Sequence, residues 1–131
     1  MEDNIQEMYK SARKAFKVIE FWPQEKVDEM VQAVAWELMK EDVRHKLGHM
    51  AVDESNIGNA EDKVNKIKNK TLGTLWDMRD AKTCGLVEED TSLGIRKYAK
   101  PIGVIANVVP CTNPESTICC LALSTLKTRN A

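Results

Sequence analysis

Hydrophobic residues recur every three or four positions along the first 76 residues, which is the spacing of one face of a helix. This pattern predicts a helix over residues 4–19 and a second helix over 23–39 that begins at a proline. A third apolar set leads to Gly58, which we interpret as a helix stop. Residues 60–76 form a fourth helical stretch, which Gly73 can disturb. The first half of the chain is therefore predicted to be helical.

The period of the pattern changes after Thr83. Residues 84–87 and 94–99 flank the polar run 88–92, an arrangement typical of a β-hairpin. The outgoing arm of this hairpin leads directly into the next apolar segment.

The most informative stretch is the apolar run over residues 101–109, followed by a polar turn and a helix over 114–126. Because residues 102–109 lack polar alternation, we interpret them as a buried parallel strand, covered on both faces as in α/β enzymes. Ligands in such sheets bind at the carboxyl ends of the strands, where this turn lies. A second parallel strand is expected after Asn130. The predicted fold class is therefore α/β.

Composition narrows the function classes. The chain has 131 residues and a net charge of −1, which allows one ordinary core and argues against nucleic-acid or membrane surfaces. Its first residues are polar and helix-patterned, unlike a secretory signal, and no apolar run could cross a bilayer. Cytoplasmic localisation is expected, with reduced cysteines that act mainly as buried small side chains: Cys84, Cys111, Cys119 and Cys120.

The turn before the last helix holds the strongest candidate for chemistry. Asn113 can cap the helix that follows, with Pro114 at its first position and Glu115 complementing the helix dipole. The same amide, together with free backbone N–H groups, could instead stabilise an oxyanion. From spacing alone the capping role is favoured. Cys111 lacks a nearby base in the sequence, so we interpret it as a packed turn residue.

Three other features of the sequence give weaker indications of a binding site. His45 and His49 share a helix face, but the residue after His45 is Lys46 and no third ligand is evident, so no metal site is expected. No dinucleotide-binding glycine motif is present. A cluster of lysines is interpreted as a solvated helix face rather than a phosphate site: Lys63, Lys66, Lys68 and Lys70.

Several short motifs, taken in order, resemble those of the CoA-acylating aldehyde dehydrogenases. This family includes the aldehyde dehydrogenase half of bifunctional aldehyde–alcohol dehydrogenase and the propionaldehyde and succinate-semialdehyde dehydrogenases. The resemblance covers most of the chain and is firm from about residue 50 onward. The matching segments are residues 50–58, 61–64, 82–85, 101–105, 109–114 and 126–131.

The resemblance implies an NAD-dependent oxidation of a small aldehyde to an acyl-CoA, through a thioester on a cysteine, in a homo-oligomer. Asn113 matches the family's oxyanion-stabilising asparagine, whereas Pro110, Cys111 and Thr112 match the turn whose backbone lies near the nicotinamide. Cys111 stands where relatives often carry Thr or Ser, and Ile57 replaces a common Met. The cofactors implied are NAD and, as co-substrate, coenzyme A.

The resemblance also implies three parts: a helical N-terminal segment of the cofactor domain (1–82), a hairpin of the oligomerisation arm (83–100) and the first strand–turn–helix of a Rossmann-like domain (101–131). The family's catalytic cysteine lies far downstream in a motif that none of the four cysteines here matches. We therefore expect the N-terminal portion of such an enzyme, inactive as this isolated chain. The alternatives are a non-catalytic helical module that docks on an aldehyde dehydrogenase partner and one half of a split enzyme.

Overall fold

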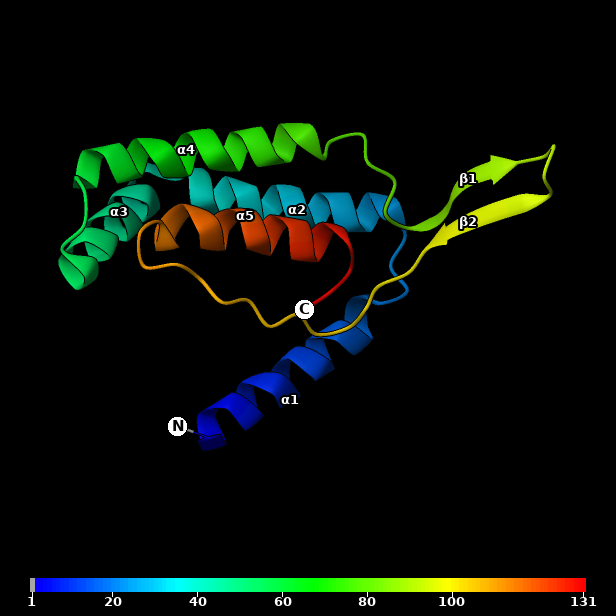
Figure 1. The fold of residues 1–131 in the computed structure, drawn as a ribbon, viewed down its shortest axis with the longest axis horizontal. Helices are drawn as coiled ribbons and strands as arrows, with labels where there is room; N and C mark the ends of the chain where they lie inside the picture. The colour runs from blue at the N-terminus through cyan, green and yellow to red at the C-terminus, as the bar shows by residue number, and fades with distance from the viewer. Residues whose placement is uncertain (1) are drawn as a thin grey trace.

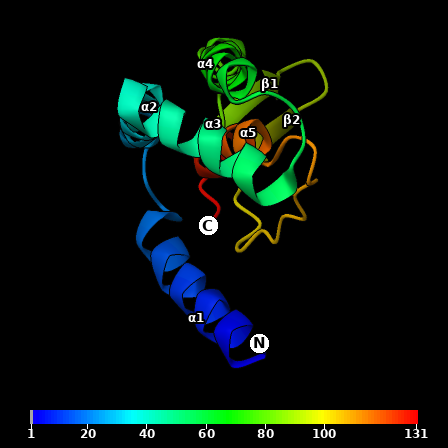
Figure 2. The same ribbon diagram turned by 90° about the vertical axis from the view of Figure 1, so that its left-hand side faces the viewer.

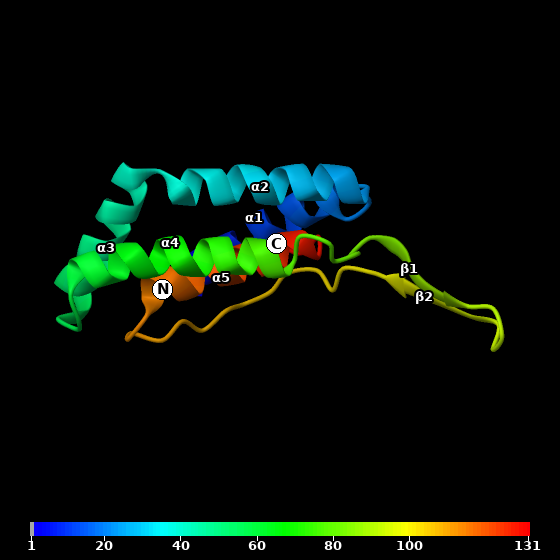
Figure 3. The same cartoon turned by 90° about the horizontal axis from the view of Figure 1, so that it is seen from above.

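The computed structural model describes residues 2–131, which form five helices and one two-stranded antiparallel sheet. Helices α2, α4 and α5 lie side by side, and α3 crosses one end of this group and contacts all three (Figures 1 and 2). The hairpin and α1 project away from this body, as the view from above also shows for the hairpin (Figure 3). In chain order the elements are α1 (Glu2–Ile19), α2 (Gln24–Met39), α3 (Glu41–Ser55), α4 (Ala60–Asp77), β1 (Gly85–Asp90), β2 (Ile95–Ala99) and α5 (Pro114–Lys127).

All five predicted helices are confirmed, with small differences at their ends. Pro23 precedes α2 in an extended conformation. Helix α3 ends at Asn56, whose φ of 54° is left-handed, so the predicted stop at Gly58 falls two residues too late. Helix α4 runs through Gly73 without interruption. Within residues 2–131 no helix has the length and apolar character that a membrane span needs.

The core lies between α2 and α5. Val27, Val31 and Ala35 from α2 pack with Leu123 from α5, and all four are buried. Helix α4 adds a second apolar face through Val64 and Ile67, which are also buried. This burial removes the i, i+3, i+4 face of each helix from water and so fixes the arrangement of the three helices.

The predicted hairpin is confirmed. Strands β1 and β2 pair in antiparallel register from Gly85 opposite Ala99 to Asp90 opposite Ile95, with an irregularity between Leu86 and Glu88. Because the hairpin projects beyond the helices, most of its side chains are exposed on both faces.

The prediction of a buried strand over residues 102–109 is wrong for this structure. The segment is extended and has no strand assignment, and the side chains of Ile102 and Val108 are 87% and 98% exposed. A strand needs neighbours that take its backbone groups, and within residues 2–131 the hydrogen-bond partners of this segment's backbone are the Asn130 side chain and the Ala131 backbone. The amide of Ile105 donates to the Ala131 carbonyl over 2.8 Å, and the Ala131 amide donates to the Gly103 carbonyl over 3.0 Å. These two bonds have the slanted pattern of a parallel pair, as expected for the residues after Asn130.

The end of α5 and the residues after it form contacts with several separate parts of the chain. Arg129, in the left-handed region with φ of 58°, is buried and donates to the carbonyls of Glu20 (2.8 Å) and Ala99 (3.0 Å). Lys127 pairs with Asp28 of α2, with 2.6 Å between Nζ and Oδ1. The ends of α1, β2 and α5 therefore converge on one short segment.

Candidate functional site

The turn at residues 111–113 lies at the start of α5, beside the loop that connects α3 and α4. Pro110, Cys111 and Thr112 are exposed, and Asn113 is half-buried. The extended segment before the turn carries it away from the hairpin and back along α5 (Figure 1). A molecule approaching from solvent can therefore reach the backbone of the turn.

The side chain of Asn113 does not cap α5, so the favoured capping prediction is wrong. No hydrogen bond joins its side chain to the backbone of the first turn. Instead Lys66 Nζ of α4 donates to Asn113 Oδ1 over 2.6 Å, and Nδ2 makes only a long contact of 3.3 Å with Thr112 Oγ1. Lys66 holds the acceptor end of the amide, which leaves the donor end available.

Behind the turn lies a buried ion pair. Lys63 Nζ is 3.3 Å from Glu115 Oε2 and also donates to the Thr112 carbonyl over 3.0 Å. The two side chains are only 4% and 1% exposed. The interpretation of the lysines as a solvated face is therefore wrong for Lys63 and Lys66, and it holds for Lys68 and Lys70, which are exposed.

Lys63 is buried and Lys66 is half-buried because α4 packs along α5. Lys63 and Lys66 are at positions i and i+3 of α4, and both side chains reach residues at the start of α5. Lys63, Lys66 and Glu115 are thus site residues that the sequence interpretation missed. The i, i+3 spacing of Lys63 and Lys66 was the available signal, but the surrounding charged residues made the whole stretch look like a solvated face.

A hollow of about 410 Å³ opens beside Asn113. It is lined by Lys66, Lys70, Asn113, Ser116, Thr117, Cys120 and Leu121. Ammonium groups and an amide donor at one opening can stabilise negative charge on a bound molecule. A larger hollow of about 620 Å³ lies elsewhere, between α2 and α4, and is mostly apolar. We place the candidate site at Asn113 because this hollow and a smaller one on the side of the α3–α4 loop are both lined by Asn113 and Lys66, the residues with matching chemistry.

The four cysteines were predicted to be buried small side chains, and the structure agrees with this only in part. Cys119 is buried as expected, and its burial raises the pKa of the thiol, which makes it a poor nucleophile. Cys120 is half-buried, and Thr74 Oγ1 of α4 donates to its sulfur over 3.2 Å. Cys111 is exposed rather than packed, because the turn projects from the helices. All four thiols are free.

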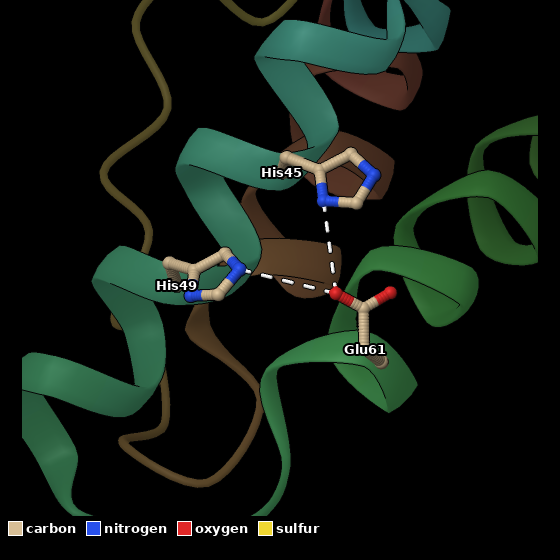
Figure 4. A group of neighbouring side chains, drawn as sticks. All are labelled: His45, His49 and Glu61. Carbon is tan, nitrogen blue, oxygen red and sulfur yellow. Dashed lines mark ion pairs between the residues drawn. The ribbon is translucent and has the colours of Figure 1, made fainter.

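The structure brings His45 and His49 together with a third residue. Glu61, in the first turn of α4, lies between the two histidines, as Figure 4 shows. The loop that connects α3 and α4 turns the chain back on itself, so spacing along the sequence did not reveal this neighbour.

The fold and the asparagine-bearing turn together indicate the N-terminal part of an aldehyde dehydrogenase. No family model matches the sequence. The fold is nevertheless close to that of an acetylating aldehyde dehydrogenase from Geobacillus thermoglucosidasius, with a TM-score of 0.92 and 31% identity over 98% of this chain and 28% of that chain. A probable aldehyde dehydrogenase from Listeria monocytogenes gives a TM-score of 0.91 with 32% identity over the same shares.

Sequence relatives agree with this class. A sulfoacetaldehyde dehydrogenase from an Acholeplasma species is 44% identical over 93% of this chain and 25% of its own length. The bifunctional aldehyde-alcohol dehydrogenase of Escherichia coli K12 is 42% identical over 91% of this chain and 13% of its own length. The chain thus spans about a quarter or less of the length of these relatives. It corresponds to the N-terminal part of the CoA-acylating aldehyde dehydrogenase family, as its motifs predicted.

Proposed function

We propose that residues 1–131 act as the N-terminal portion of an NAD-dependent acylating aldehyde dehydrogenase, which converts an aldehyde, CoA and NAD into an acyl-CoA and NADH. The support comes from relatives whose names specify this chemistry: acylating sulfoacetaldehyde dehydrogenase from Bilophila wadsworthia, at 41% identity, and acetylating succinate-semialdehyde dehydrogenase from Clostridium kluyveri, at 36%. Because these relatives differ in substrate, the proposal is limited to small aldehydes as a class.

One observation carries the proposal: the amide of Asn113 faces an open hollow and does not cap its own helix. When a thiolate attacks an aldehyde carbonyl, negative charge develops on the oxygen, and a fixed N–H donor stabilises that charge. In our proposal Asn113 Nδ2 is this donor. Lys66 orients the amide by holding Oδ1, so the donor need not reorganise during the reaction.

The neighbouring turn suits a bound nicotinamide. Pro110, Cys111 and Thr112 are exposed next to Asn113, and a hollow of about 340 Å³ lies beside Thr112 and Asn113. NAD would accept hydride from the aldehyde carbon. Within this chain the turn would position the cofactor through backbone groups, which makes the cysteine at position 111 compatible with the role. Coenzyme A would be the acyl acceptor.

The three proposed parts follow the elements. Residues 1–82 hold the helices, 83–100 the projecting hairpin, and 101–131 the turn and α5. The hairpin is proposed as part of an oligomerisation arm, since it extends beyond the helices and exposes Leu93 and Tyr98 at 70% and 57%. The exposed apolar side chains of Ile102 and Val108 favour this enzyme portion over a separate binding module, because a module that functions alone would leave this apolar surface in water.

The nucleophile of the proposed reaction is not among the four cysteines. Cys119 is buried, and Cys111 has no hydrogen-bonded base within residues 2–131. We therefore propose that the purified chain alone does not reduce NAD in the presence of propionaldehyde and CoA. Measurable NADH formation by this chain would contradict that part of the proposal.

The decisive experiment replaces Asn113 by alanine in the enzyme that contains this chain. Loss of one oxyanion donor is expected to lower kcat by about 100- to 1,000-fold. The matched control is Asn107→Ala, which removes an exposed asparagine from the same segment. Activity is normalised to folded protein, measured by circular dichroism. A loss of stability with unchanged turnover per folded molecule would reject the oxyanion role.

A further inference from the structure

His45, His49 and Glu61 form a cluster of three groups that can each bind a metal ion. The histidines lie on successive turns of α3, with their rings stacked and the centroids 6.3 Å apart. Glu61 Oε1 lies 3.8 Å from His45 Nδ1 and 3.9 Å from His49 Nε2 (Figure 4). One ligand atom from each residue lies within 4.8 Å of the other two.

These distances are close to what one ion requires. Zinc binds imidazole nitrogen and carboxylate oxygen at about 2.0–2.2 Å, which places ligand atoms of one tetrahedral site about 3.3–3.6 Å apart. The ligand atoms observed here are farther apart than this, but a small rotation of the side chains would bring them to these distances. Such a rotation is unhindered here, because the side chains of His45, His49 and Glu61 are 40%, 57% and 65% exposed.

A fourth residue, Glu41, lies beside the cluster. Glu41 Oε1 lies 3.9 Å from His45 Nε2, on the side of the ring opposite Glu61. Histidines that bind metals commonly donate their other ring N–H to a carboxylate, which orients the ring and strengthens it as a ligand. At 3.9 Å the contact between Nε2 and Glu41 is too long for a hydrogen bond, and the Glu41 side chain is 83% exposed. Glu41 would therefore have to move closer to take this role.

We propose that His45 Nδ1, His49 Nε2 and Glu61 bind a single divalent transition-metal ion such as zinc, with water at the remaining position. The donor set of two imidazoles and one carboxylate suits zinc, nickel or copper. The ion would join α3 to the first turn of α4. Its effect would be structural, because Glu61 lies in the first turn of the helix from which Lys63 and Lys66 reach the Asn113 turn. The site does not depend on the proposed enzymatic function.

The test is a calorimetric titration of zinc chloride into the purified protein in the presence of a phosphine reductant. One-to-one binding that EDTA reverses is expected. Glu61→Gln and His49→Gln should each weaken zinc binding by about tenfold or more, since even the loss of a partner outside the ligand shell costs about 10–100-fold. Glu41→Gln should weaken binding less than Glu61→Gln. All three substitutions are at exposed positions, so circular dichroism should show an unchanged fold.

The matched control is Glu54→Gln, which removes the same charge from an exposed position on α3 outside the cluster. This variant should bind zinc like the unmodified protein. Two outcomes would overturn the assignment. One is the absence of saturable zinc binding. The other is one-to-one binding that persists in both Glu61→Gln and His49→Gln, which would place the ion elsewhere, for example on the thiols.

Discussion

The ion pair between Lys63 and Glu115 places two full charges in the interior, next to the candidate site. Removing both side chains from water is costly, and their attraction offsets that cost only while both remain. Lys63 also holds the carbonyl of Thr112, the residue directly before Asn113. The pair therefore connects the stability of α4 and α5 to the position of the turn.

Replacing Lys63 by methionine should lower the free energy of unfolding by about 3–5 kcal/mol, because it leaves the Glu115 carboxylate buried without a partner. The measurement is urea unfolding followed by circular dichroism. The double variant Lys63→Met with Glu115→Leu should recover much of the loss, since two packed apolar side chains need no counter-charge. If the losses of the single variants simply add in the double variant, the two charges are not coupled as the structure indicates.

At the residue scale, the position of the site could be predicted from the sequence, whereas the hydrogen-bond and ion-pair partners of its residues could not. The turn, its proline and the helix start at Pro114 were predictable because they depend on neighbouring residues. The partners of Asn113 and Glu115 were not, because Lys66 and Lys63 lie 47 and 52 positions away along the chain. A local rule favours capping for any asparagine before a helix, and a distant lysine reversed that preference here.

Helices α3 and α4 approach each other closely at Gly48. A β-carbon at this position would lie 2.6 Å from Val64 Cγ2 and 3.1 Å from the Ala60 carbonyl oxygen. Glycine normally weakens a helix, so its presence here is explained by packing rather than by helix propensity. The same approach of the two helices brings Glu61 to the histidines.

Gly48→Ala should therefore destabilise the protein by about 1–3 kcal/mol, despite the better helix propensity of alanine, because backbone atoms of α4 must move. Gly73→Ala in α4 is the matched control. Nothing lies within 4 Å of its added carbon, so a gain of about 0.5–1 kcal/mol is expected. Thermal or urea unfolding of both variants gives the comparison. A stabilising Gly48→Ala would contradict the close packing of α3 on α4.

The helices and the hairpin, whose backbone hydrogen bonds are local, were predictable from the sequence. The extended segment 102–109, whose backbone needs partners distant in the sequence, was not. The helices and the hairpin satisfy their backbone groups within short segments, so periodicity and turn residues were sufficient. Residues 102–109 have the composition of a buried strand, yet within residues 2–131 half of them are exposed and only Gly103 is buried. Apolar composition indicates that a segment needs covering, and it does not say which residues provide the cover.

At the scale of the whole molecule, the order of the extended segment depends on the residues after α5. Asn130 is buried, and its Oδ1 accepts from the amides of Ile102 (2.7 Å) and Gly103 (2.8 Å). Its Nδ2 donates back to Thr128 Oγ1 over 2.8 Å, which fixes the orientation of the amide. One side chain thus holds the start of the segment that leads to Asn113.

Asn130→Ala removes the acceptor of two backbone amides and should lower the free energy of unfolding by about 1–3 kcal/mol. The amides of Ile102 and Gly103 should also exchange with deuterium faster, because their protection depends on Asn130 Oδ1. Asn107→Ala, at an exposed position of the same segment, should change stability by no more than about 0.5 kcal/mol and leave these amides protected. Unchanged exchange at Ile102 and Gly103 in Asn130→Ala would mean that the Ala131 backbone pairing alone holds the segment. In that case the buried Asn130 stabilises the end of α5 and does not hold the segment that leads to Asn113.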